Sequence, residues 1–247
     1  MGEMWAGNGS SISKHVRTEA GKMGVLYSKL SLFKWTIDKY INFYSFQLKN
    51  SSSKTFVFVG NELTYNRSFT NLAYSSERSI ELPIVMNFLK QNKPSKILEV
   101  GNVLNHYFSI PHVVVDKYEM ANGVINKDIV DYCPDTKFDM IICISTLEHV
   151  GFDEPAVEEV KTLTAIQKMQ DLLAPNGKII ITVPLGHNPY LDKFLINGTI
   201  SFPEMHLIKR ISAHNTWEEQ PLYFLQTEEF KYNYPFQYGN WILILHN

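Results

Sequence analysis

Acidic residues and one glycine stand where apolar, strand-like runs end. Glu99 comes two residues before Gly101, and Asp116 closes a run of three valines. Asp128 follows the short β-rich run 124–126. Since parallel strands end at one edge of a sheet, these groups are expected to meet there. A glycine at such a turn lets backbone amides approach a charged ligand, and carboxylates accept hydrogen bonds, so the spacing predicts a small-molecule site.

Two histidines follow later strand-like runs. His149 comes after the run 138–144, and His187 comes after the run 178–183. Both are therefore expected on the same sheet edge as the carboxylates. A histidine near a reacting hydroxyl could act as a general base worth about 10²–10⁴-fold in rate, and a structural role is the alternative for each. No histidine pair has the helical spacing and acidic partner of zinc hydrolases, so no metal site is predicted.

The elements that position these residues alternate between strand and helix after Pro94. Helices are predicted at 77–91 and 155–173, the second ending before Pro175, Asn176 and Gly177. This alternation specifies an α/β fold, with a Rossmann-like, mainly parallel sheet of about seven strands and helices on both faces. The strands expected from the apolar runs are 96–100, 112–116, 124–126, 138–144, 178–183 and 241–245.

An N-terminal extension, residues 1–76, is predicted to precede the main domain at 77–247. After a flexible start, apolar residues at alternating spacings of three and four indicate an amphipathic helix at about 25–48. A short hairpin is expected at about 55–66. The apolar face of the helix could pack on the domain itself, or it could dock to a membrane surface or a protein partner.

Composition narrows the function. The net charge is −2 and the basic residues are scattered, which argues against a nucleic-acid partner and favours a small polar or glycan-like substrate. The two cysteines do not suggest a disulfide framework, and a reducing compartment is expected. No signal peptide or membrane span is recognisable, so the chain is predicted to be cytoplasmic and, through its N-terminal helix, membrane-peripheral at most.

Five segments, taken in order and spacing, resemble class I methyltransferases that use S-adenosylmethionine. The most specific is 138–150, which ends in Leu-Glu-His-Val. Shorter stretches after Gly101, Asp116, Ser145 and Pro184 resemble an uncharacterised methyltransferase-like group associated with bacterial and archaeal surface-glycan loci. The resemblance implies a transferase with S-adenosylmethionine as cofactor and a role in glycan biosynthesis. The five segments are 96–101, 113–116, 126–129, 138–150 and 172–184.

The resemblance also implies roles for single residues. Asp116 would accept hydrogen bonds from the cofactor ribose, with helix capping as the alternative. Asp128 and Ile129 would contact the adenine edge, unless Asp128 is only a turn residue. Glu148 would close the cofactor pocket. Glu77 and Arg78 could face the pocket, although a surface ion pair is the simpler interpretation. The predicted cofactor residues are Glu99, Gly101, Asn102, Asp116, Asp128, Ile129, Ser145 and Glu148; the predicted catalytic residues are His149 and His187; and the predicted substrate contacts are Asn188 and Asp192.

One departure from the family pattern lies in the first turn. Gly101 is its only glycine, and just 15 residues separate Gly101 from Asp116, against about 20 in a dinucleotide-binding unit. The first helix must therefore be short or absent. Asn102 and Asn105 are candidate donors to the methionyl carboxylate in its place.

Three functions are compatible with these observations. The first is methylation of an oxygen atom on a small molecule or glycan intermediate. The second is a catalytically silent module that docks a partner through the N-terminal helix. The third, nucleotide-sugar or NAD chemistry, is weaker because the Leu-Glu-His-Val segment has no place in it.

Overall fold

The computed structural model describes residues 34, 37–46, 48 and 54–247. The chain forms two compact units that divide between Lys49 and Asn50. In the first unit, the described residues are helical, within the predicted helix at 25–48. The rest of that helix and the predicted flexible start lie outside the described residues. Everything from the hairpin onward falls in the second unit, so the boundary differs from the predicted one at residue 76.

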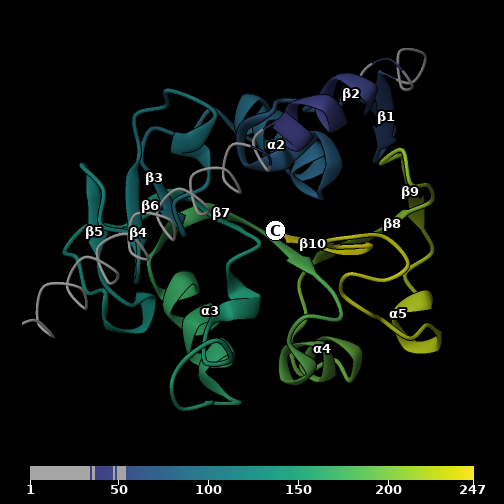
Figure 1. Ribbon diagram of the computed structural model, residues 1–247. Helices are drawn as coiled ribbons and strands as arrows, with labels where there is room; N and C mark the ends of the chain where they lie inside the picture. The colour runs from purple at the N-terminus through teal and green to yellow at the C-terminus, as the bar shows by residue number, and fades with distance from the viewer. Residues whose placement is uncertain (1–33, 35–36, 47, 49–53) are drawn as a thin grey trace, which may run out of the picture. The chain divides into compact units, whose positions relative to one another are not determined.

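The second unit is built on an eight-stranded sheet of order β5-β4-β3-β6-β7-β10-β8-β9 (Figure 1). From β3 the chain moves outward through β4 to β5, then returns to pair β6 on the other side of β3, which is the 3-2-1-4-5 order of Rossmann-like folds. Strands β3 to β7 are parallel, whereas β10 is antiparallel to both β7 and β8. The strands are β3 (Ile97–Val100), β4 (Val113–Asp116), β5 (Val124–Asn126), β6 (Phe138–Ile144), β7 (Leu173–Pro184), β8 (Glu204–Arg210), β9 (Trp217–Gln220) and β10 (Trp241–His246).

Helices cover both faces of this sheet, as predicted. Helix α2 (Arg78–Asn92) lies on one face, and α3 (Lys161–Asp171), α4 (Pro189–Ile196) and α5 (Phe224–Thr227) lie on the other (Figure 1). The strands are buried on both sides, so neighbouring residues enter different cores. In β6, Ile141 and Cys143 pack in the core beneath α3 and α4, whereas Ile142 and Ile144 pack in the core beneath α2.

The hairpin of β1 (Thr55–Phe58) and β2 (Asn61–Thr64) confirms the prediction at 55–66 and belongs to the core beneath α2. Pro83 lies inside α2 and has no N–H to donate to the Ser79 carbonyl one turn earlier. The Asn66 amide donates to that carbonyl instead, at 2.8 Å. The segment that follows the hairpin is therefore hydrogen-bonded directly to α2.

Both cysteines are free, with Cys143 buried in β6 and Cys133 exposed. This agrees with the expectation that the chain has no disulfide framework. Among residues 34, 37–46, 48 and 54–247, no helix combines the length and apolar character that crossing a bilayer requires.

Candidate functional site

The turn after β3 needs glycine for two reasons. Gly101 has a φ of +85°, in the left-handed region that side chains disfavour. A Cβ atom there would also lie 2.1 Å from Oγ1 of Thr146, which follows β6. The Gly101 amide donates to the Val115 carbonyl at 2.9 Å, which ties the turn to β4. The backbone at this point is thus held close to the ends of two neighbouring strands.

Glu99 supports this turn from behind. It is fully buried, and its Oε1 accepts hydrogen bonds from the amides of Val103 at 3.0 Å and Leu104 at 2.7 Å. Its Oε2 lies 2.7 Å from Nε2 of His112, also buried. Burial alone would lower the pKa of His112, but hydrogen bonds to Glu99 and the Ile110 carbonyl outweigh it and raise that pKa. Glu99 supports the turn and does not line the pocket described next; its predicted contact with the cofactor stays a prediction.

The residues after Val103 confirm that the first helix is nearly absent. Only the 3-10 turn η2 (Leu104–His106) stands between β3 and β4. The Glu99 carboxylate accepts hydrogen bonds from the Val103 and Leu104 amides at the start of this turn, where a longer helix would otherwise begin.

A pocket of about 430 Å³ opens at the carboxyl ends of β3, β4 and β5. It lies beside the point where the strand order reverses, between β3 and β6, which is where open α/β sheets bind ligands. Its size falls in the range of small-molecule sites. The lining residues are Val100, Gly101, Val115, Asp116, Lys117, Tyr118, Glu119, Lys127, Asp128, Ile129, Thr146, His149, Val150 and Glu154.

Asp116 lines this pocket and also organises it. Its Oδ1 accepts hydrogen bonds from the amides of Tyr118 at 2.8 Å and Glu119 at 2.7 Å, while its Oδ2 accepts from the Asn102 amide at 3.1 Å. Asp116 therefore does act as a cap, as the alternative interpretation predicted, but it caps a turn and not a helix. A carboxylate offers about four acceptor positions, so capacity for a ligand hydroxyl remains.

The two asparagines of the first turn have protein partners. Asn102 donates from Nδ2 to Glu119 at 2.6 Å and accepts from Asn105 at 2.8 Å. Asn102 is buried and does not line the pocket, which weakens its predicted contact with the methionyl carboxylate. Glu119 does line the pocket and was missed; the signal available was its spacing of three residues after Asp116.

Asp128 also combines two roles. It caps the 3-10 turn η3 (Ile129–Asp131) by accepting from the Val130 amide at 3.2 Å. Its Oδ2 lies 3.0 Å from Nζ of Lys117 and 2.9 Å from Nζ of Lys161. Burial alone would raise the pKa of Asp128, but these two lysines outweigh it and lower the pKa. Glu154 contacts the same two lysines, so two cations and two anions form a compact group, of which Lys117, Asp128 and Glu154 line the pocket.

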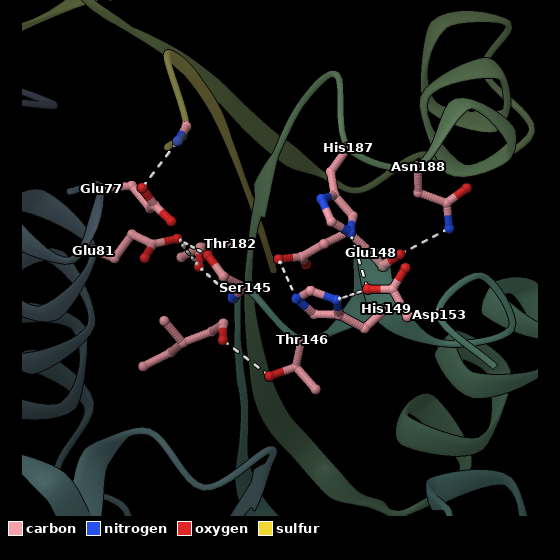
Figure 2. A network of polar contacts seen from close by, with 12 residues as sticks. Glu77, Glu81, Ser145, Thr146, Glu148, His149, Asp153, Thr182, His187 and Asn188 are labelled. Carbon is pink, nitrogen blue, oxygen red and sulfur yellow. Dashed lines mark hydrogen bonds and ion pairs between the residues drawn. The ribbon is translucent and has the colours of Figure 1, made fainter. Parts of the chain in front are cut away.

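The predicted histidines come together on a shared aspartate at the rim (Figure 2). Nδ1 of His149 lies 2.5 Å from Oδ2 of Asp153, and Nε2 of His187 lies 3.2 Å from the same oxygen. The two imidazole centroids are 4.7 Å apart. Asp153 follows His149 by four residues, a spacing visible in the sequence but not used in the prediction.

Next to the histidines lies a buried acidic group. Glu148 is 2% exposed, and burial raises its pKa well above the usual range. In Figure 2 its carboxylate lies between the histidines and the pair Glu77 and Glu81 of the α2 region. Glu81 accepts hydrogen bonds from Ser145 at 2.5 Å and Thr182 at 2.7 Å and pairs with Arg78. Ser145 and Glu148 are buried and do not line the pocket, and their predicted cofactor contacts stay predictions.

Glu77 and Arg78 do not form a surface ion pair. Glu77 is buried and accepts a hydrogen bond from the Gly239 amide at 3.0 Å, and Arg78 pairs with Glu81 instead. Burial and the nearby Glu81 raise the pKa of Glu77.

The two predicted substrate contacts are part of the scaffold. Asn188 caps α4 by accepting from the amides of Tyr190 and Leu191, and it donates to the Glu148 carbonyl at 2.9 Å. Asp192 accepts from the Gly186 amide at 2.8 Å. Burial, opposed only by this hydrogen bond, raises the pKa of Asp192 to about 6. Both side chains are buried and neither lines the pocket: Asn188 caps the first turn of α4, and Asp192 binds the loop before it.

No known protein family matches this sequence, and no curated protein matches it. Among solved structures, the N-methyltransferase NodS of Bradyrhizobium japonicum with S-adenosyl-L-homocysteine is 15% identical, with a TM-score of 0.43 over 69% of this chain and 85% of that one. An S-adenosylmethionine-dependent methyltransferase of Clostridium acetobutylicum is 10% identical, with a TM-score of 0.35 over 66% and 88%. The sugar N-methyltransferase KedS8 of Streptoalloteichus is 13% identical, with a TM-score of 0.36 over 63% and 64%. Similarity this distant carries no conclusion about ligand or reaction.

Proposed function

We propose that this protein is an S-adenosylmethionine-dependent methyltransferase that methylates an oxygen atom of a small molecule or glycan intermediate in the cytoplasm. The observation that carries the proposal is the pocket at the reversal of strand order, which is lined by the glycine turn and by the strand-end carboxylates Asp116 and Asp128. The free cysteines agree with a reducing compartment.

The lining of the pocket fits the three parts of this cofactor. The methionyl end would lie against Gly101, which lines the pocket together with Thr146; a side chain at position 101 would clash with Thr146 and so disturb this part of the lining. Asp116 and Glu119 would accept the ribose hydroxyls, and Asp128 with Ile129 would meet the adenine. The cofactor supplies an electrophilic methyl group on a sulfonium. Methyl transfer needs mainly alignment of acceptor, methyl and sulfur, which a rigid sheet edge can provide.

The histidines His149 and His187 at the edge of the pocket favour a hydroxyl group as the methyl acceptor. His149 lines the pocket, and His187 lies beside it on Asp153. A hydroxyl must lose its proton as it attacks, so polar groups at the rim would assist that loss. Asp153 contacts both rings, which places the predicted catalytic histidines next to each other.

The rest of the sheet argues against NAD chemistry. A dinucleotide fold has order 3-2-1-4-5-6 from two similar βαβαβ halves. Here the antiparallel β10 lies between β7 and β8, so the second half is of another kind.

A silent binding module is the second candidate. It is favoured by the N-terminal helix, in which Ile37, Ile41, Tyr44 and Leu48 are exposed. Such a row would suit a protein partner or a membrane surface. In this case the pocket would take no cofactor.

Calorimetric titration of the full chain separates these functions. The methyltransferase is expected to bind S-adenosylmethionine and S-adenosylhomocysteine at one site and to ignore NAD. Binding of NAD alone would indicate dehydrogenase-type chemistry, and binding of none of the three, even at millimolar concentration, would leave the binding module.

A further inference from the structure

Two histidines and an aspartate at the pocket rim converge on a single point in space. His149, Asp153 and His187 each offer one ligand atom, and these three atoms lie within 4.8 Å of one another. Two come from the loop after β6 and one from the loop after β7, so the two strand ends bring the set together (Figure 2). A single general base would need one histidine, whereas here two rings face the same carboxylate oxygen.

The spacing is close to that of a metal site. Ligand atoms that are about 2.0–2.2 Å from one ion lie at most about 4.4 Å apart. The three atoms lie within 4.8 Å of one another, and His149 and Asp153 are 46% and 44% exposed, so small side-chain rotations would bring all three atoms within this limit. The same exposure leaves open positions for a further ligand.

A neighbouring buried carboxyl group has an oxygen without a hydrogen-bond partner. Glu148 is 2% exposed, and its Oε2 has no hydrogen-bond partner, while its Oε1 lies 3.5 Å from Nε2 of His149. A buried carboxylate oxygen without a partner is costly, and a nearby cation would stabilise it.

We propose that His149, Asp153 and His187 bind a divalent metal ion of the Zn²⁺ or Co²⁺ kind at the edge of the pocket, with the Glu148 carboxylate next to it. Two imidazoles favour such ions over Mg²⁺ or Ca²⁺, which prefer oxygen ligands. Three protein ligands with open positions are typical of a catalytic site. If the proposed methyltransferase function holds, the ion would bind the acceptor hydroxyl, lower its pKa and let its proton pass to water before the oxygen attacks the methyl group.

Metal binding is tested on the untagged full chain after removal of metals with a chelator. The protein is titrated with Co²⁺, whose visible absorption reports its ligands, and with Zn²⁺ by calorimetry. One equivalent is expected to bind, and His187→Ala and Asp153→Asn are each expected to weaken binding at least about 10-fold. His214→Ala, which changes an exposed histidine outside the cluster, should leave binding unchanged. Thermal melts without metal establish that each variant is folded.

Equal binding by the wild type and the folded His187→Ala and Asp153→Asn variants would overturn the site, as would no binding at millimolar metal. The S-adenosylmethionine titration is repeated with chelator present. Cofactor binding without any metal binding would overturn this inference and leave the proposed function standing. Metal binding without cofactor binding would support the metal site and overturn the proposed methyltransferase function.

Discussion

At the scale of single residues, the acidic side chains at the strand ends hold the backbone before they can hold a ligand. Glu99, Asp116 and Asp128 each accept hydrogen bonds from amides of the loop that follows. Such charge-assisted bonds fix a loop more firmly than neutral ones. Sequence patterns identify these residues as important, but they cannot tell whether the partner is backbone or ligand, because both present N–H or O–H donors to the same oxygens.

At Gly101 the steric clash of an added side chain can be separated experimentally from the cost of its left-handed backbone. Gly101→Ala adds a left-handed alanine and also a methyl group against Thr146, so it should destabilise the fold and block cofactor binding. Gly123 is the matched control, because it has a φ of +83° but no heavy atom within 4 Å of an added Cβ. Gly123→Ala should cost about 1–2 kcal/mol in unfolding free energy and leave cofactor affinity unchanged.

Denaturant unfolding and cofactor titration measure both effects. Adding Thr146→Ala to Gly101→Ala removes the clashing oxygen and should recover part of the lost stability. Equal destabilisation by the two glycine changes, with no recovery in the double variant, would contradict the steric account.

Asp116 allows the ligand role to be separated from the loop role. Asp116→Asn keeps one acceptor oxygen but removes the charge, and it should weaken S-adenosylmethionine binding by about 1–3 kcal/mol. Asp139→Asn is the control, because Asp139 also accepts two backbone amides, from Ser95 and Lys96, at the start of its strand. Unchanged cofactor affinity in folded Asp116→Asn, measured by calorimetry, would remove Asp116 from the site.

Asp192 should make stability depend on pH. Its pKa in the folded state is about 6, above the ordinary value of 3.8, so the unfolded chain releases this proton first. Its contribution to stability is therefore greatest below about pH 4 and is lost as pH rises toward 6. Asp192→Asn keeps the acceptor for the Gly186 amide and removes the cost of the buried charge. The variant should be more stable than wild type by about 1–3 kcal/mol at pH 7.5.

The difference between variant and wild type should shrink as the pH is lowered to 4. Denaturant unfolding at a series of pH values measures it, with exposed Asp135→Asn as a control that should change little. If the difference in unfolding free energy between variant and wild type stays constant from pH 4 to 7.5, the pKa of Asp192 is not raised by burial in the folded protein.

At the scale of elements, the strands with continuous apolar runs could be predicted and the polar ones could not. The predictions for β3, β4, β5, β6 and β10 agree with the structure to within one residue at each end. β7 begins at Leu173, five residues before its predicted start, because Leu173 already pairs with Phe138 of β6. The pairing resumes at Lys178 after an irregularity in which Asn176 has a φ of +64°. β8 and β9 were missed, since β9 reads Trp-Glu-Glu-Gln and gains its strand from pairing with β8 rather than from burial.

Helix predictions erred where the chain makes local contacts that the periodicity does not show. Helix α3 was expected from residue 155 but begins at Lys161. The Glu158 amide instead donates to the Gly151 carbonyl at 2.7 Å, and the Glu154 carboxylate binds Lys161. These contacts close a loop that positions Asp153 and Glu154 at the pocket. Helix α4 was missed, although Asn188 and Pro189 form a recognisable cap and first turn.

The N-terminal helix is predicted to be separable from the pocket. The chain divides between Lys49 and Asn50, and the residues that line the pocket all lie in the second unit. A truncated chain that begins at Asn50 should therefore fold and bind S-adenosylmethionine with the affinity of the full chain. Calorimetry on both chains decides this. A folded truncation that has lost cofactor affinity would show that the first unit helps to build the site.

At the scale of the whole molecule, the order of the strands explains why distant residues meet. Gly101, Asp116, Asp128 and His149 are separated along the chain, yet β3 to β6 are neighbours and end at one edge. The sequence predicted this edge correctly. It could not predict that Glu119, Lys117 and Glu154 would line the pocket, because their positions follow from loops whose hydrogen bonds have no periodic signature.

A crystal structure of the full chain with S-adenosylhomocysteine would show whether this sheet edge binds the proposed cofactor. The adenine is expected beside Asp128 and Ile129, the ribose hydroxyls on Asp116 or Glu119, and the amino-acid end against Gly101. The sulfur should point toward His149. Density for the ligand anywhere else, or an empty pocket at saturating ligand, would contradict the account.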